Sequence, residues 1–293
     1  MTENPRSRSW FHHDVSLFRD ALERSAANGG LRSQLIEKDY YCSILLGDLS
    51  ILFKNGLVFK GGTCLSKVYN DFFRMSEDLD FSVPISSDAT RSQRRAAWAP
   101  IKEHLSTVCD RIPFFSFTGD FRGRNENRHY QCRLYYSSAL VGESGYIKVE
   151  VSLREKLLLQ PVIREARTFL THPDTRAEVI SPVSVLVPQL KEAYAEKIRA
   201  AVSRKVPAIR DFFDVDHAAR NALINQHDPE LHSLVEEKLR VSAGDHVDLS
   251  ENRIKLLGEQ IESQLRPVLR SRDYQTFDLN RVTLFLNNVI KSS

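Results

Sequence analysis

Two aspartates separated by a single residue, Asp78 and Asp80, are the side chains of this 293-residue chain best placed to do chemistry. Apolar residues at 79, 81 and 83 alternate with polar residues at 78, 80 and 82, which predicts a strand with both carboxylates on one face. Along a strand, such residues lie roughly 6.5–7 Å apart. Carboxylates that converge at this spacing can share Mg²⁺, a hard cation that prefers oxygen ligands. The alternative is a solvated edge strand.

A glycine pair precedes the acidic strand, with Gly62 sixteen residues before Asp78. The apolar residues that follow the pair at i, i+3, i+4 and i+7 predict an amphipathic helix; they are Leu65, Val68, Tyr69 and Phe72. The N-terminus of such a helix offers unpaired N–H groups to a phosphate, Gly61 and Gly62 allow close backbone approach, and Thr63 adds a hydroxyl. Taken alone, the pair is also explained as an ordinary tight turn. Together, the turn and the acids predict a site for a nucleoside triphosphate.

This segment resembles the signature of the AbiEii/AbiGii nucleotidyltransferase toxins, within the DNA polymerase β-like nucleotidyltransferase superfamily. The resemblance rests on Lys-Gly-Gly-Thr-x-Leu-Ser-Lys at 60–67 and Arg-x-Ser-Glu-Asp-Leu-Asp at 74–80. Weaker matches lie at 36–40, 195–200 and 210–214. The resemblance implies an α+β fold, with a polymerase β-like core built on a mixed sheet and followed by a C-terminal helical domain.

A third carboxylate can be sought in residues 145–153, where apolar and polar residues alternate again. Glu150 lies on the polar face of this predicted strand. The strand pattern alone makes it an exposed edge charge. The resemblance instead implies that Glu150 completes the metal site and helps to activate the attacking hydroxyl.

Lys197 falls on the apolar stripe of a predicted helix over 187–204, which puts an ammonium on a face that packs into the core. Either its charge reaches solvent past a packed stem, or it binds the triphosphate and stabilises charge on the leaving pyrophosphate. The resemblance favours the second role. Asp211 and Asp214 lie at i and i+3 of the next predicted helix. Either they form ordinary local ion pairs, or one of them is an acid that orients Lys197. Asp211 is the preferred candidate.

Two other polar groups have simpler explanations. Arginines crowd the segment between two strand-like runs and could hold RNA phosphates or mark a polar hairpin tip; they are Arg122, Arg124, Arg128 and Arg133. His12 and His13 have no Cys or acid at ligand spacing, and we expect an exposed pair.

Composition sets the wider limits. With 42% hydrophobic and 27% charged residues the chain can bury an extensive core, and the net charge of +3 leaves RNA binding to a local basic surface. Four scattered cysteines indicate reduced thiols, and the absence of an apolar leader or long apolar segment predicts a cytoplasmic protein. Prolines at 161, 173, 182 and 188 mark a junction between a nucleotidyltransferase domain at 1–175 and a helical domain at 176–293.

The function expected from these residues and the resemblance is transfer of a nucleotide from an NTP, with Mg²⁺ or Mn²⁺ as the metal. The resemblance implies an RNA acceptor, with the tRNA 3′ end as the first candidate. It also implies a toxin that inhibits translation, acts in phage defence and is neutralised by an antitoxin encoded nearby. Two alternatives stay open, which are nucleotidylation of a protein and a catalytically silent nucleotide-binding module.

Overall fold

The computed structural model describes residues 9–54, 56–86, 88–117, 121–124, 128–153, 157–241 and 246–291. It divides into two compact units, Met1–Leu157 with Pro161–Val187, and Leu158–Gln160 with Pro188–Ser293. The division falls after Val187, later than the junction expected at residue 175, because β8 (Val183–Val187) pairs with β7 (Val162–Ala166) inside the first unit. The functional domain limits stay a prediction.

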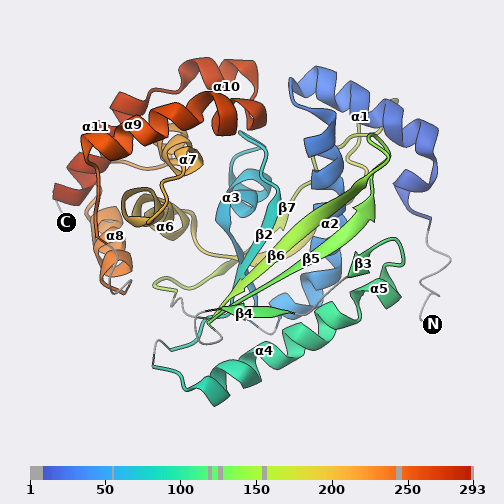
Figure 1. The fold of residues 1–293 in the computed structure, drawn as a ribbon, viewed down its shortest axis with the longest axis horizontal. Helices are drawn as coiled ribbons and strands as arrows, with labels where there is room; N and C mark the ends of the chain where they lie inside the picture. Colours follow the sequence, from blue (N-terminus) through green and yellow to red (C-terminus); the bar gives the residue numbers. More distant parts are fainter. Residues whose placement is uncertain are drawn as a thin grey trace. The chain divides into compact units, whose positions relative to one another are not determined.

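A mixed sheet forms the centre of the first unit (Figure 1), as the sequence predicts. Its strand order is β1-β2-β6-β5-β3, with β4 also paired to β5. Strands β2 and β6 are parallel, and the other pairs are antiparallel. The strand bounds are β1 Val58–Lys60, β2 Asp78–Ser82, β3 Ser116–Phe117, β4 Arg122–Arg124, β5 His129–Ser137 and β6 Ser144–Ser152.

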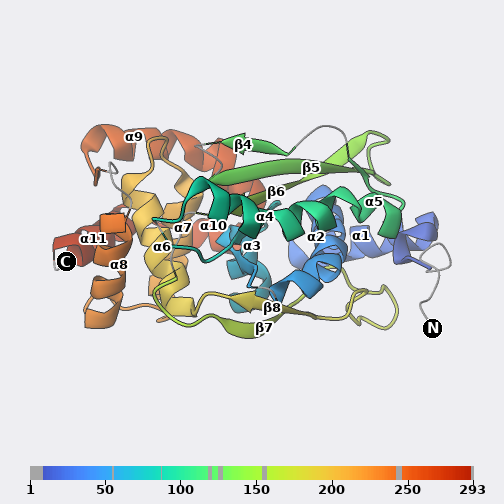
Figure 2. The ribbon, with the colours of Figure 1, turned by 90° about the horizontal axis from the view of Figure 1, so that it is seen from below.

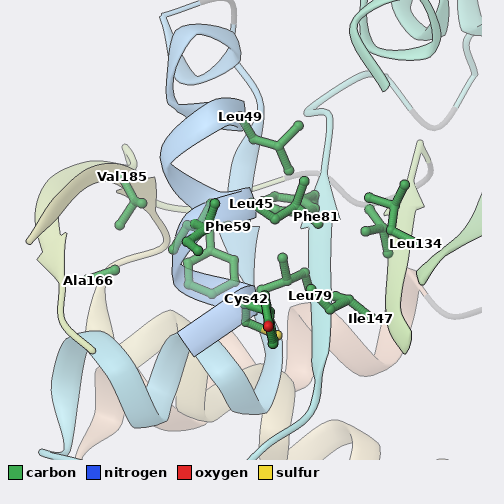
Figure 3. Close-up of a cluster of buried hydrophobic side chains, with 14 of the residues drawn as sticks. Cys42, Leu45, Leu49, Phe59, Leu79, Phe81, Leu134, Ile147, Ala166 and Val185 are labelled. Carbon is green, nitrogen blue, oxygen red and sulfur yellow. The ribbon is translucent and has the colours of Figure 1, made fainter. Parts of the chain in front are cut away.

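Helix α2 (Ser33–Phe53) lies between this sheet and the β7–β8 hairpin (Figures 2 and 3). Because it is covered from both sides, it is apolar around most of its circumference. Figure 3 shows Leu45 and Leu49 of α2 beside Phe81 of β2, with Val185 of β8 on the other side of the helix. All four side chains are buried. The strand that carries the two aspartates is therefore anchored to the core through its apolar face.

The remaining helices of the first unit are α1 Val15–Gly29, α4 Arg91–Ser106, α5 Val108–Arg111 and a 3-10 turn at Phe11–His13. The short connection between β1 and β2 contains α3 (Gly61–Cys64) and a π-helical turn, η3 (Leu65–Tyr69). Helix α4 starts with a capping box, in which the side chains of Thr90 and Gln93 each accept from the other's backbone N–H.

The prediction of an exposed histidine pair is wrong for His12. Its Nδ1 lies 2.9 Å from the Tyr40 hydroxyl, and its ring packs against Phe114 with centroids 4.4 Å apart. Burial, together with the neighbouring charge of His13, lowers the pKa of His12 to about 4. The aromatic neighbours come from distant parts of the chain, so the ligand-spacing rule applied to the sequence could not find them.

The second unit is helical in its described residues, as expected after Pro188. Its elements are α6 Leu190–Ser203, α7 Ile209–Arg220, α8 Pro229–Val241, α9 Glu251–Gln260, η4 Ile261–Leu265, η5 Arg266–Val268, α10 Ser271–Thr276 and α11 Leu279–Lys291. The buried carboxylate of Glu192 accepts from the backbone N–H groups of Leu158 and Leu159 and pairs with Lys238 of α8 at 2.7 Å. Across both units, no described helix combines the length and apolar character needed to cross a bilayer.

Candidate active site

Three of the predicted acids lie on two neighbouring strands. In β2, Leu79 and Phe81 are buried while Asp78 and Asp80 face the opposite side of the sheet and are partly exposed. The parallel register of β2 and β6 pairs Asp80 directly with Glu150. Adjacent strands are about 4.8 Å apart, so these two carboxylates are nearest neighbours across the sheet. The parallel pairing thus places the two acid-bearing strands side by side, which the sequence could not show.

A lysine that the sequence reasoning missed lies among these acids. Lys148 pairs with Asp78 in the register, and its Nζ is 2.7 Å from Asp78 Oδ2 and 3.1 Å from Glu150 Oε1. Burial opposes its charge, but the hydrogen bond to Asp78 and the two carboxylate charges raise the pKa of Lys148 above its ordinary value. His129 Nε2 lies 3.8 Å from the other oxygen of Glu150. The available signal was that Lys148 precedes Glu150 by two residues and so shares its face.

The glycine pair lies directly against the acids. Gly61 is the first residue of α3, so the helix begins at the pair and not after it as expected. Its φ is +78°, and a Cβ at this position would lie 2.3 Å from Asp80 Oδ2. A Cβ on Gly62 would lie 2.3 Å from Nη2 of Arg74, a buried side chain. Both positions therefore need glycine for close approach, Gly61 to the predicted metal ligand and Gly62 to an arginine.

Thr63 has a different role from the one its hydroxyl suggested. The residue is buried, and its hydroxyl lies within hydrogen-bond distance of the Asp78 carbonyl and 2.9 Å from Ser76 Oγ. These contacts tie the first turn of α3 to the start of β2. The Thr63 hydroxyl is therefore already engaged, and a phosphate at this turn would rely on backbone N–H groups of the helix start.

Residues 37–39, which matched the resembled family without an assigned duty, connect α2 to the site. Lys38 Nζ pairs with Glu77 Oε2 at 3.0 Å, and Glu77 immediately precedes Asp78. Asp39 pairs with Lys67 of η3 at 2.5 Å, and both side chains are buried. Two successive residues of α2 thus hold the segments on either side of the loop between η3 and β2.

Glu37 fixes the far end of the β5–β6 hairpin. Its buried carboxylate accepts from the Ser138 hydroxyl at 2.7 Å and from the Ala139 N–H at 2.6 Å. Burial raises the pKa of Glu37, although these two hydrogen bonds act in the opposite direction. Since β6 carries Glu150, the helix α2 positions both acid-bearing strands.

Lys197 and Asp211 form an ion pair in the second unit. Lys197 Nζ lies 2.8 Å from Asp211 Oδ1 and 3.0 Å from Asp214 Oδ2, so the lysine contacts both candidate acids. Asp211 Oδ2 also lies 3.0 Å from the exposed guanidinium of Arg204. The two carboxylates hold the ammonium in a defined position on α6. Its action on a triphosphate stays a prediction.

Of the four arginines between the strand-like runs, the structure describes the side chains of two. Arg133 is exposed, and its guanidinium lies 4.7 Å from the centroid of the Tyr146 ring. Arg128 is exposed and immediately precedes β5. The side chains of Arg122 and Arg124, in β4, lie outside the described part of the structure.

The residues fit a divalent ion in donor chemistry and in strand position. Asp78, Asp80 and Glu150 offer hard oxygen ligands from adjacent strands, which suits Mg²⁺. Yet within residues whose placement is described, no three His, Cys, Asp or Glu side chains are gathered tightly enough to hold a metal. The ammonium of Lys148 lies against two of the three acids instead.

Comparison with known proteins gives one family match and two similar structures. The family model described as nucleotidyl transferase AbiEii toxin, type IV toxin–antitoxin system, matches residues 44–282. The crystal structure of JHP933 from Helicobacter pylori is similar, with a TM-score of 0.51, 17% identity, and coverage of 89% of this chain and 92% of that chain. A second H. pylori protein, provisionally named as a nucleotidyltransferase, gives a TM-score of 0.49 and 16% identity over 86% of this chain and 93% of that chain.

The two kinds of comparison carry different weight. At 17% identity, the likeness to JHP933 shows the fold alone. No curated protein sequence matches the chain. The family match is broader, because residues 44–282 take in most of both compact units. The chain belongs to the AbiEii nucleotidyltransferase toxins of type IV toxin–antitoxin systems.

Proposed function

We propose that this nucleotidyltransferase transfers a nucleoside monophosphate from an NTP to an RNA acceptor, with the 3′ end of a tRNA as the first candidate. Modified in this way, the tRNA could no longer be aminoacylated or used, and translation would stop. Membership of a toxin–antitoxin family implies a cognate antitoxin, which we propose is encoded nearby and restrains the activity. Arrest of translation in an infected cell would serve phage defence.

The observation that carries this proposal is the junction of Gly61, Asp80 and Glu150. Gly61 lies close enough to Asp80 to exclude any Cβ, and Asp80 is the register partner of Glu150. A helix start that can hold phosphates therefore adjoins two carboxylates that can hold a divalent ion. This combination supports a site for a metal–triphosphate complex more than a site for a phosphate or a metal alone.

Each residue has a distinct task in the proposed reaction. The N–H groups of Gly61, Gly62 and Thr63 bind the distal phosphates of the NTP. Asp78, Asp80 and Glu150 hold Mg²⁺ or Mn²⁺, which when bound neutralises phosphate charge and polarises the phosphoryl oxygens.

Glu150 also accepts the proton of the acceptor hydroxyl as its oxygen attacks the α-phosphorus. A new ester bond forms, the bond between the α-phosphorus and the bridging oxygen breaks, and pyrophosphate leaves. Lys197, oriented by Asp211 and Asp214, stabilises the charge on that leaving group. No covalent intermediate with the protein is required.

The test is label transfer with the purified protein, α-labelled NTPs, Mg²⁺ and total tRNA. Asp80→Ala is expected to reduce transfer by about 10²–10³-fold, because the ion loses a ligand and the triphosphate loses its counter-charge. Asp110→Ala, which removes a carboxylate from α5, is the matched control and should retain activity. Label transfer that survives Asp80→Ala would contradict the assignment. Label that remains with protein after nuclease treatment would show a protein acceptor instead.

A further inference from the structure

Lys148 places one positive charge inside the cluster of proposed metal ligands. Its Nζ contacts one oxygen of Asp78 and one of Glu150, and its side chain is only 26% exposed. Asp80 belongs to the same face of the sheet through its pairing with Glu150. An ammonium is thus built into the acid cluster by the strand register, in which Lys148 lies directly opposite Asp78.

This arrangement has an electrostatic reason. Like charges on directly opposed strand positions repel, and Asp80 and Glu150 are directly opposed. Lys148 offsets that repulsion between the acids while no divalent ion is bound. Its four-carbon stem is flexible enough to let the ammonium leave when another cation arrives.

The same oxygens cannot serve both cations. Asp78 Oδ2 and Glu150 Oε1 are hydrogen-bonded to Lys148, so a divalent ion that uses either oxygen must replace the ammonium, and an ion that uses only the other two oxygens would lie beside a like charge. A group that binds the metal-free form stabilises that form and weakens metal binding by the same free energy. Lys148 therefore neutralises the carboxylates when the metal is absent and competes with the metal for them when it is present.

We propose that Lys148 is the resident counter-ion of the acid cluster and that the divalent metal must displace it to bind. The inference rests on the proposed metal site and adds a control on it. A metal ion alone gains little from the exchange, whereas a metal–triphosphate complex brings phosphate oxygens that can accept the released ammonium. The site then favours a metal that arrives with its nucleotide.

The test measures Mn²⁺ binding by the full-length protein in the absence of nucleotide. The electron paramagnetic resonance signal of free Mn²⁺ reports how much of the ion is unbound. Lys148→Met is expected to bind Mn²⁺ at least tenfold more tightly than wild type, since it removes the competing charge while keeping a side chain of similar length. Lys148→Arg keeps the charge and should resemble wild type. Lys102→Met, at an exposed position of α4, controls for the loss of one positive charge elsewhere.

The outcomes separate this inference from the proposed function. Mn²⁺ binding by Lys148→Met that is no tighter than by wild type overturns the counter-ion role. Tighter Mn²⁺ binding that persists in the double variant Lys148→Met/Asp80→Asn also overturns the counter-ion role, because the ion would then lie outside the acid cluster. Tighter binding that depends on Asp80, together with no nucleotide transfer by wild type, supports the counter-ion and contradicts the proposed function. Lys148→Gln repeats the comparison if the methionine variant does not fold.

Discussion

Gly61 shows how much can depend on the absence of one carbon atom. Its backbone has φ +78°, and the space where a Cβ would lie is taken by Asp80 Oδ2 at 2.3 Å. The left-handed region costs an ordinary residue about 1–2 kcal/mol even where there is room for it. At this position a side chain would also push the proposed metal ligand out of place. The backbone conformation and the approach of Asp80 therefore require glycine for separate reasons.

Gly61→Ala is expected to lose nearly all nucleotide transfer and to lower the free energy of unfolding by about 1–2 kcal/mol or more. Gly30→Ala is the matched control, because Gly30 has φ +64° and open space within 4 Å of the position that a Cβ would take. The control should lose similar stability in urea unfolding but keep its activity. Equal activity of the two variants would contradict the proposed approach of Gly61 to Asp80.

At the scale of elements, α2 holds the site through a pair of buried charges. Asp39 and Lys67 are each about 3% exposed, and Asp39 also accepts from the backbone N–H of Phe169 at 2.9 Å. Removing one member of such a pair leaves the other charge without compensation in the interior. The pair therefore fixes η3 to α2 and, through η3, the glycine pair that precedes it.

Asp39→Asn should lower the free energy of unfolding by about 3–5 kcal/mol, measured by urea denaturation. Adding Lys67→Met should restore part of the loss, since the uncompensated charge is then gone. Glu236→Gln, which breaks an exposed pair with Arg240 on α8, should have little effect. A double variant less stable than Asp39→Asn alone would show that packing, and not charge, dominates at this position.

The elements also show where prediction from the sequence succeeds and where it stops. Alternation was sufficient to place Asp78, Asp80 and Glu150 on the polar faces of two strands, since side-chain direction in a strand repeats every two residues. It could not reveal Lys148 as the partner of Asp78, because register between distant strands depends on tertiary pairing. The sequence also predicted that the helix begins after the glycines. Its true start at Gly61 could not be found in this way, because the contact of Gly61 with Asp80 forms only in the folded chain.

At the scale of the whole molecule, His12 links stability to pH. Its pKa in the folded protein is about 4, below the ordinary value of 6.5, so between these values the unfolded chain binds a proton that the folded chain does not. The contribution to stability is fully present above pH 6.5 and is lost as the pH falls toward 4. Allowing for partial exposure, we expect a loss of about 1–2 kcal/mol.

The measurement is urea unfolding at pH 4.5 and pH 7 for wild type and His12→Gln. The variant keeps a hydrogen-bonding side chain but has no group that titrates, so its stability should fall less than that of wild type at the lower pH. His246→Gln, at an exposed position in the second unit, should follow wild type. An unchanged difference between wild type and His12→Gln at the two pH values would contradict the buried neutral histidine.

The parallel pairing of β2 with β6 has a consequence for the cell that makes this toxin. Parallel neighbours need a long intervening stretch of chain, and here everything from Val83 to Glu143 separates the two strands. A polypeptide still emerging from the ribosome carries Asp78 and Asp80 long before Glu150 exists to sit beside them. Until residue 150 has been made, an unfinished chain therefore lacks one of the three proposed metal ligands, and we expect it to have no nucleotidyltransferase activity.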